Sequence, residues 1–138
     1  MPRILLLTAD ENEACTLQEI LGDYAHLVHA RNLWEMRSRL EEDGCDVFFC
    51  AWAFYRGFWN GAFQEVRERY PELPVVVLSH TSGAPEWLEV LEAGAFDFLR
   101  FPCQKPTLVG VVEQAIISHE ARKARNFAGL RRAEEMQH

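Results

Sequence analysis

Serine, histidine and cysteine are the residue types in this chain that could act as nucleophiles or bind a metal ion. Ser79 and His80 are adjacent, but the sequence identifies neither a carboxylate to orient the histidine nor an oxyanion hole. The four cysteines include no CxxC pair, and no histidine follows any of them at zinc-ligand spacing. We therefore expect reduced, unpaired thiols. The alternative is a site where strand ends converge, formed by Cys103 and His80 with or without Cys50.

Short catalytic motifs are absent from the sequence. It contains no GxxxxGK phosphate loop, no GxGxxG, no GxSxG elbow and no HExxH. The sequence thus predicts a protein that is not an enzyme and that holds no cofactor and no metal.

The charge of the chain is uneven along its 138 residues. The net charge is −7, and from Glu120 onward there are five basic residues against three acidic ones, so the first 119 residues carry −9. Because affinity for nucleic acid comes largely from clustered Lys and Arg, this acidic body argues against nucleic acid as the main ligand. Apolar runs such as Leu73–Leu78 are too short to span a bilayer, and the start of the chain has no signal-peptide pattern. We expect a cytoplasmic protein without a membrane segment.

Strands and helices are predicted to alternate along the chain. Four nearly continuous apolar runs indicate buried parallel strands at residues 4–7, 47–50, 74–78 and 96–99, and residues 26–30 form a weaker, edge-type strand. Apolar residues at helical spacing lie between them: Ala14, Leu17, Ile20 and Leu21; Leu33, Met36 and Leu40; Phe63, Val66 and Tyr70; Leu88, Leu91 and Ala95. The pattern predicts an α/β, three-layer sandwich with a five-stranded parallel sheet.

The last helix is predicted to begin near Pro106 and to leave the folded body. Its large apolar residues become sparse after His119, and the alanines that follow do not form a coiled-coil seam. We therefore divide the chain into a folded domain, residues 1–119, and a C-terminal helical extension or linker, residues 120–138.

Three segments resemble the receiver domains of two-component response regulators. Residues 3–10 (RILLLTAD) are similar to the first strand of that family, residues 73–79 (LPVVVLS) to the fourth, and residues 93–102 (AGAFDFLRFP) to the fifth. The similarity extends from about Arg3 to His119. It implies a flavodoxin-like topology with strand order 2-1-3-4-5 and a role in signalling.

The resemblance also shows what this chain lacks. Phosphotransfer in the family uses an acidic pair after the first strand, an acceptor aspartate at the end of the third, and a lysine before a proline after the fifth, which together hold magnesium and the phosphoryl group. These positions correspond to Thr8 and Ala9, to Ala51, and to Phe101, while Ser79 keeps the family's hydroxyl. The chain thus resembles a degenerate receiver, or pseudo-receiver, in which Ala9, Ala51 and Phe101 are predicted to form an apolar plug.

Two regions are predicted to contact partners. The segment 52–63 holds six of the 16 aromatic residues, of which we expect Trp52 and Phe54 to cover the vacant pocket. Receiver domains commonly pair through their fourth helix, fifth strand and fifth helix, which implies a homodimer through that face. The candidate partner surface consists of Phe58, Trp59, Trp87, Val90, Phe98 and Arg100.

Three functions remain open from the sequence. The leading hypothesis is a signalling module that binds protein partners without phosphotransfer. The second is a small-ligand sensor that uses the apolar pocket at the carboxyl ends of the strands. The third is a conventional phosphorylated regulator in which a displaced carboxylate, such as that of Asp10, substitutes.

Overall fold

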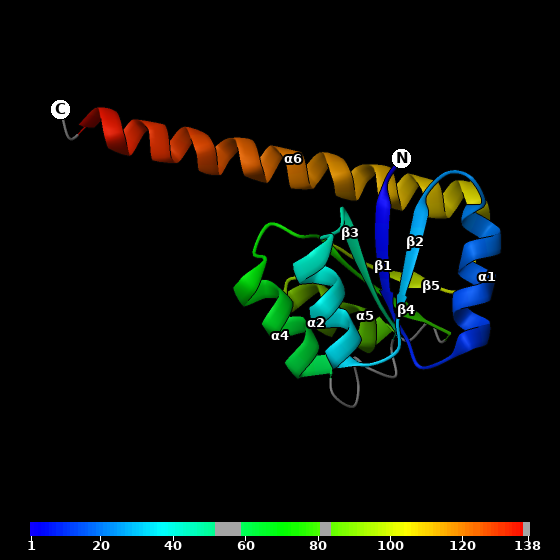
Figure 1. The fold of residues 1–138 in the computed structure, drawn as a ribbon. Coiled ribbons are helices and arrows are strands. Elements are labelled where there is room, and N and C mark those ends of the chain that lie inside the picture. Colours follow the sequence, from blue (N-terminus) through cyan, green and yellow to red (C-terminus); the bar gives the residue numbers. More distant parts are fainter. Residues whose placement is uncertain (52–58, 81–83, 137–138) are drawn as a thin grey trace.

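A five-stranded parallel sheet forms the centre of the molecule (Figure 1). The computed structural model describes residues 1–51, 59–80 and 84–136, with side chains described except at 59–61, 84–87 and 122–136. The strand order is β2-β1-β3-β4-β5, which confirms the predicted fold class and topology. The strands are β1 (Arg3–Leu7), β2 (His26–Ala30), β3 (Val47–Ala51), β4 (Val75–Ser79) and β5 (Asp97–Arg100).

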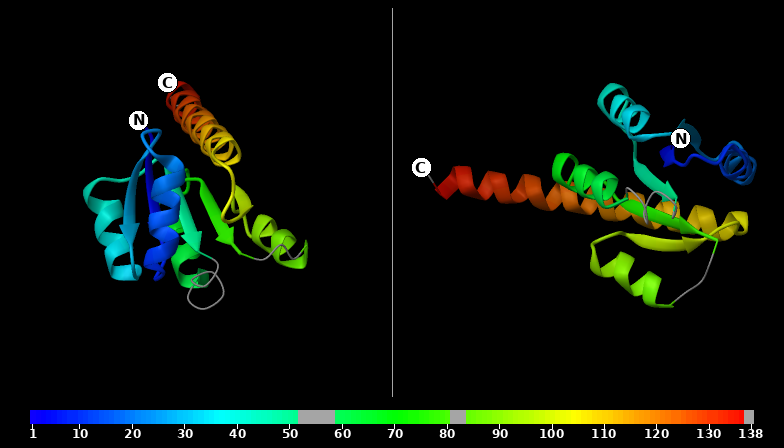
Figure 2. Two further views of the ribbon diagram at one scale, coloured as in Figure 1. Left: turned by 90° about the vertical axis from the view of Figure 1, so that its right-hand side faces the viewer. Right: turned by 90° about the horizontal axis from the view of Figure 1, so that it is seen from below.

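Helices cover both faces of the sheet (Figure 2). The described helices are α1 (Glu11–Leu21), α2 (Leu33–Glu42), α4 (Trp59–Arg69), α5 (Ala84–Glu92) and α6 (Lys105–Met136). One apolar layer packs α2, α4 and α5 against the sheet, and the other packs α1 and α6 against the opposite face. The arrangement is the predicted three-layer sandwich.

Strand alternation explains why the strand sequences are almost entirely apolar. Leu5 and Leu7 of β1 lie in the layer of α2, whereas Ile4 and Leu6 lie in the layer of α1. Because successive side chains point to opposite faces, a strand covered on both sides needs an apolar residue at every position. All five residues of β3 and of β4 are buried, and Ser79, which ends β4, is the polar residue among them.

Polar side chains begin the first two helices. Asp10 caps α1 by accepting hydrogen bonds from the backbone N–H groups of Asn12 and Glu13, and Asn32 caps α2 by accepting one from Glu35. Each cap satisfies N–H groups that have no partner within the helix. The start of α1 is thereby fixed beside the carboxyl end of β1.

Helix α6 is the longest element and continues past the body of the sheet (Figure 1). It runs without a break from Lys105 to Met136, so the boundary that we predict at residues 119 and 120 falls within one helix. None of the described helices is long and apolar enough to span a membrane.

Candidate functional site

The positions that correspond to the receiver phosphate site gather at the carboxyl edge of the sheet. Thr8 follows β1, Ala51 ends β3, Ser79 ends β4, and Phe101 follows β5. The backbone N–H of Phe101 donates to the carbonyl oxygen of Ser79 at 2.7 Å, and Ala51 pairs in register with Leu78 of the neighbouring strand. Ligands of open α/β sheets bind at this edge, so it is the place where a receiver-type site would lie.

All four of these residues are enclosed. Thr8 is 2% exposed, Ala51 4%, Ser79 1% and Phe101 2%. A methyl group and a phenyl ring thus occupy places where phosphotransfer needs a nucleophilic carboxylate and a cation.

Ala9 does not take part in this enclosure. It is exposed, because it lies in the turn between buried Thr8 and the capping residue Asp10. The prediction that Ala9 forms part of an apolar plug is therefore wrong.

The Asp10 carboxylate is already occupied by hydrogen bonds at the start of α1. This carboxylate caps α1, and the backbone N–H of Asp10 donates to the Thr8 hydroxyl at 3.1 Å. The carboxylate that we considered as a displaced ligand is thus used to hold the helix start.

A different carboxylate enters the site from α1. Glu13 is 7% exposed, and its Oε2 lies 2.8 Å from Nε2 of His80, the residue that follows β4. Its Oε1 is buried and has no hydrogen-bond partner among the residues that the structure describes. His80 is itself largely exposed and places its ring edge-to-face on Phe101, with centroids 6.1 Å apart. The site is therefore not purely apolar, because it contains a buried carboxylate paired with an imidazole.

Glu13 is not among the site residues predicted from the sequence. It lies four residues before Leu17, which places it on the buried stripe of α1 together with Leu17 and Leu21. A charged residue on that stripe was the available signal. Its pairing with His80 could not be read from the sequence, because 67 residues separate the two.

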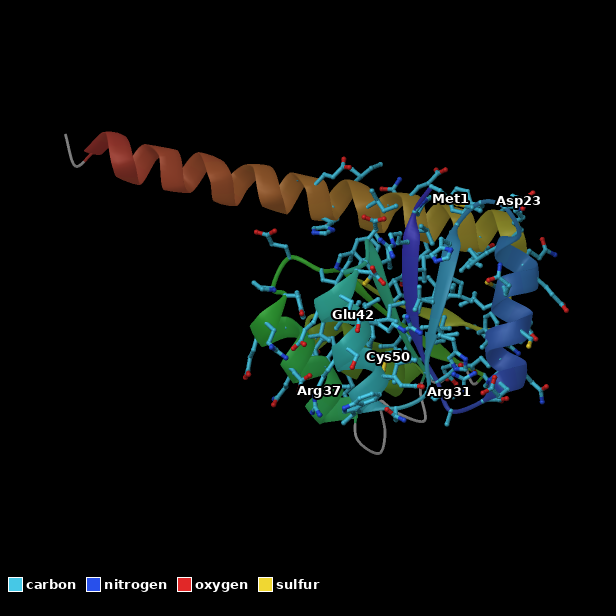
Figure 3. All side chains as sticks on the ribbon, in the orientation of Figure 1. Met1, Asp23, Arg31, Arg37, Glu42 and Cys50 are labelled. Atoms are coloured by element: carbon cyan, nitrogen blue, oxygen red, sulfur yellow. The ribbon has the colours of Figure 1, made fainter. Side chains whose placement is uncertain are left out.

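The cysteines do not assemble into a metal site. Cys50 packs in the layer of α2 (Figure 3), whereas Cys103 packs against the layer of α1 and α6. Cys103 and Cys50 thus lie on opposite faces of the sheet and do not form the site with His80 that we considered. All four cysteines are free. In residues 1–51, 59–80 and 84–136, no group of three or more His, Cys, Asp or Glu side chains is placed to hold a metal ion.

Burial also controls the reactivity of Cys50. Burial, with a smaller contribution from the charge of Glu13, raises the pKa of its thiol from 9.0 to about 12. The thiol donates weakly to the carbonyl oxygen of Ala51 at 3.7 Å. Cys50 is therefore an uncharged core residue rather than a nucleophile.

The candidate partner surface is only partly as predicted. Arg100 is exposed and Phe98 is half-buried, but Val90 is fully buried. Val90 lies on the inner side of α5 and packs in the apolar layer of α2 and α4, so its assignment to the surface is wrong. Phe58, with the pocket-covering Trp52 and Phe54, lies outside the described residues, and so do the side chains of Trp59 and Trp87.

Two exposed apolar residues lie on the elements that flank β5. Leu88 of α5 is 51% exposed, although helical spacing predicts that it lies on a buried face, and Ile117 of α6 is 57% exposed. With Arg100 of β5, they offer apolar and charged groups from three consecutive elements.

Solved structures of receiver domains share this fold. NtrX from Brucella abortus matches with a TM-score of 0.79 and 21% identity over 94% of this chain, which spans 29% of the NtrX chain. A response regulator from Thermotoga maritima matches with a TM-score of 0.74 and 21% identity, over 84% of this chain and 98% of its own. The beryllofluoride-activated dimer of the NtrC4 receiver domain, from Aquifex aeolicus, matches with a TM-score of 0.76 and 20% identity, over 86% and 99%.

The chain thus has the fold of a response-regulator receiver domain, as the sequence resemblance implies. No protein-family model and no curated protein sequence matches it.

Proposed function

We propose that the chain is a signalling module that acts through protein partners and takes no phosphoryl group at the end of β3. The observation that carries the proposal is Ala51, which ends β3 with a side chain that cannot be phosphorylated. Phe101 supports it, because an enclosed phenyl ring supplies no positive charge for phosphoryl oxygens.

Glu13 strengthens the argument by electrostatics. Its carboxylate is buried beside the end of β4, and a phosphoryl group entering this site would bring further negative charge close to it. Like charges in a poorly solvated site repel strongly. The Glu13 carboxylate therefore disfavours a phosphoryl group at this site, in addition to the lack of an acceptor at Ala51.

The proposed partner face uses α5, β5 and α6, which are the fourth described helix, the fifth strand and the fifth described helix. The proposed first partner is a second copy of the chain. Exposed Leu88 and Ile117 supply apolar area, and Arg100 supplies charge at the edge strand. The receiver domain of NtrC4, which shares the fold, forms a dimer in its beryllofluoride-activated state. In this proposal, residues 1–119 are the receiver-like domain, and residues 120–138 are an extension that transmits or supports pairing.

The test is incubation with acetyl phosphate and magnesium, followed by intact-mass spectrometry. We expect no species heavier by one phosphoryl group, while a receiver domain with its acceptor aspartate gains one under the same conditions. A stable acyl phosphate on this chain would contradict the proposal.

Glu13 defines the second candidate, a regulator phosphorylated on a displaced carboxylate. It is the buried carboxylate that the fold brings to this edge of the sheet. If a phosphoryl group appears on the wild-type chain and is lost in Glu13→Gln, the second candidate replaces the first.

A further inference from the structure

A cavity of about 410 Å³ lies at the end of the molecule opposite the degenerate phosphate site. It is bounded by the end of α2, the loop before β3, the segment 69–73 between α4 and β4, and His119 of α6. Cys45 and Leu73, which line it, each lie two residues before a strand begins. A five-residue strand, roughly 16 Å long, therefore separates this cavity from the carboxyl edge of the sheet. We call it the α6-root pocket, because His119 lies where α6 leaves the body.

One wall of the α6-root pocket is apolar. Leu40 and Leu73 are buried members of the core layer of α2 and α4, and Tyr70 packs against the same layer. Cys45 lies beside them as an uncharged thiol, because burial raises its pKa to about 12. This wall can accept a flat apolar group without chemical reaction.

The rim carries nitrogen donors from two different helices. Arg69 comes from α4, and its Nη2 lies 3.2 Å from Oε1 of Glu41, a pair that uses one of the five guanidinium N–H groups. His119 comes from α6 and is half-buried. The cavity is also lined by Glu72, whose side chain already interacts with another group. The guanidinium and the imidazole thus line the same cavity.

The backbone also leaves room at this place. Gly44 lines the pocket with φ of +65°, and a Cβ added there would meet no atom within 4 Å. The volume falls within the range of roughly 300–1,000 Å³ typical of small-molecule sites, which combine an apolar wall with a few convergent polar groups.

We propose that the α6-root pocket binds a small organic anion that has a flat apolar part. The apolar part packs on Leu40, Tyr70 and Leu73, and the anionic group accepts hydrogen bonds from Arg69 and His119. The occupant thus touches α4 and α6 together, at the base of the 17 helical residues that follow His119. This site goes beyond the proposed partner function and does not depend on whether the degenerate site takes a phosphoryl group.

The test is a titration of the ¹⁵N-labelled chain, followed by NMR, with two probes of nearly the same shape. The first is 8-anilinonaphthalene-1-sulfonate, which has fused rings and one sulfonate, and the second is N-phenyl-1-naphthylamine, which lacks the sulfonate. We expect saturable shifts at the amides of Gly44, Cys45, Leu73 and His119 with the first probe. The neutral probe should bind about tenfold more weakly, since a charge-assisted hydrogen bond is lost.

Two arginine variants localise the anionic group. Arg69→Gln should weaken binding of the sulfonate probe about tenfold, whereas Arg37→Gln should leave it within about twofold of the wild-type value. Arg37, labelled in Figure 3, is the matched control. Like Arg69, it joins α2 to α4 through a carboxylate, in this case that of Glu65 at 2.8 Å, and its side chain is about as exposed as that of Arg69.

Three results would overturn the proposal. They are saturable shifts that avoid the amides of the pocket, equal binding of the charged and neutral probes, and equal effects of Arg69→Gln and Arg37→Gln. A spectrum of Arg69→Gln with native dispersion away from the pocket shows that a loss of binding does not come from unfolding.

Discussion

At the scale of single residues, the Glu13–His80 pair distinguishes this site from an apolar plug. The carboxylate is almost fully buried, whereas the imidazole that partners it is about 60% exposed. Transfer of a carboxylate from water to the interior is unfavourable, and the hydrogen bond from His80 offsets only part of that penalty. The two residues should therefore respond differently to substitution.

Removal of His80 should destabilise the protein more than removal of Glu13. His80→Ala leaves the Glu13 carboxylate buried without its partner, which we expect to lower the free energy of unfolding by about 1–3 kcal/mol. Glu13→Leu removes the desolvated charge and should change it by less than about 1 kcal/mol. Urea denaturation measures both.

The double variant completes this comparison. His80→Ala in the Glu13→Leu background should have almost no effect, because no buried carboxylate remains. An equal loss of stability in both backgrounds would show that the pair contributes nothing.

The thiols of Cys45 and Cys50, each with a pKa raised to about 12, should resist alkylation. With a pKa of about 12, about one Cys50 thiol in ten thousand is ionised at pH 8, and only the thiolate reacts. We expect iodoacetamide at pH 8 to modify exposed Cys15 and to leave Cys45 and Cys50 intact, as peptide mass mapping of the native protein would show.

The same pKa values give a pH dependence of stability. The folded protein keeps these protons to about pH 12, whereas unfolded thiols lose theirs near pH 9. Between these values the native state binds more protons, so the free energy of unfolding should fall as pH rises. Cys50→Ala should make that fall shallower; an unchanged slope would contradict the assignment.

At the scale of elements, Arg67 joins α4 to the end of α5. Its Nη1 donates to the carbonyl oxygen of Ala93 at 2.5 Å, and its guanidinium lies over Gly94, while its Cζ lies 5.7 Å from the centroid of the Phe63 ring. Gly94 has φ of +104° and no side chain, so the cation can cross the backbone there. The turn from α5 into β5 therefore depends on glycine.

Gly94→Ala should destabilise the fold. A Cβ at that position would lie 1.6 Å from Nη1 of Arg67, so this exposed side chain must turn away and give up its hydrogen bond to Ala93. The positive φ strains any residue with a Cβ, and we expect a total loss of about 1–3 kcal/mol in the free energy of unfolding, measured by urea denaturation.

Gly110 provides the matched control. It lies inside α6, and a Cβ there would meet nothing within 4 Å, so Gly110→Ala should stabilise the protein by roughly 0.5–1 kcal/mol. If both substitutions had the same sign of effect, the role assigned to Arg67 and Gly94 would be wrong.

At the scale of the whole molecule, the two ends of the sheet differ in whether they offer a cavity to a ligand. The carboxyl edge has its phosphate-site residues enclosed, whereas the amino edge has a cavity beneath α6. The edge strand β5 is flanked by α5 and α6, which carry the exposed apolar side chains of Leu88 and Ile117. Communication with partners is therefore proposed through the β5 side and through α6.

Pairing through this side should be sensitive to charge. Light scattering of the wild-type chain should give about twice the 15.9 kDa of one chain, and Leu88→Glu or Ile117→Glu should shift the mass toward the monomer, because a charge in an apolar contact is not solvated. Trp34→Glu is the control, since Trp34 is 72% exposed but lies on α2. A monomeric wild type, or dissociation caused only by Trp34→Glu, would refute this interface.

The sequence by itself determined the alternation of strands and helices and the residue type that ends β3. Continuous apolar runs such as residues 47–51 are typical of strands covered on both faces, and the side chain of Ala51 carries no nucleophile in any fold. These properties are local, because they depend on side-chain type and on spacing within one element.

Tertiary structure alone decided which side chains meet and which face solvent. It paired Glu13 with His80 and buried Val90, while it left Leu88 and Ala9 exposed. It also formed the α6-root pocket from segments as distant as Leu40 and His119. Helical spacing gives a stripe but not its exact rotation against the sheet, and contacts between distant segments depend on how the layers pack. For this reason the sequence shows which chemistry is missing at Ala51, and only the fold shows what surrounds it.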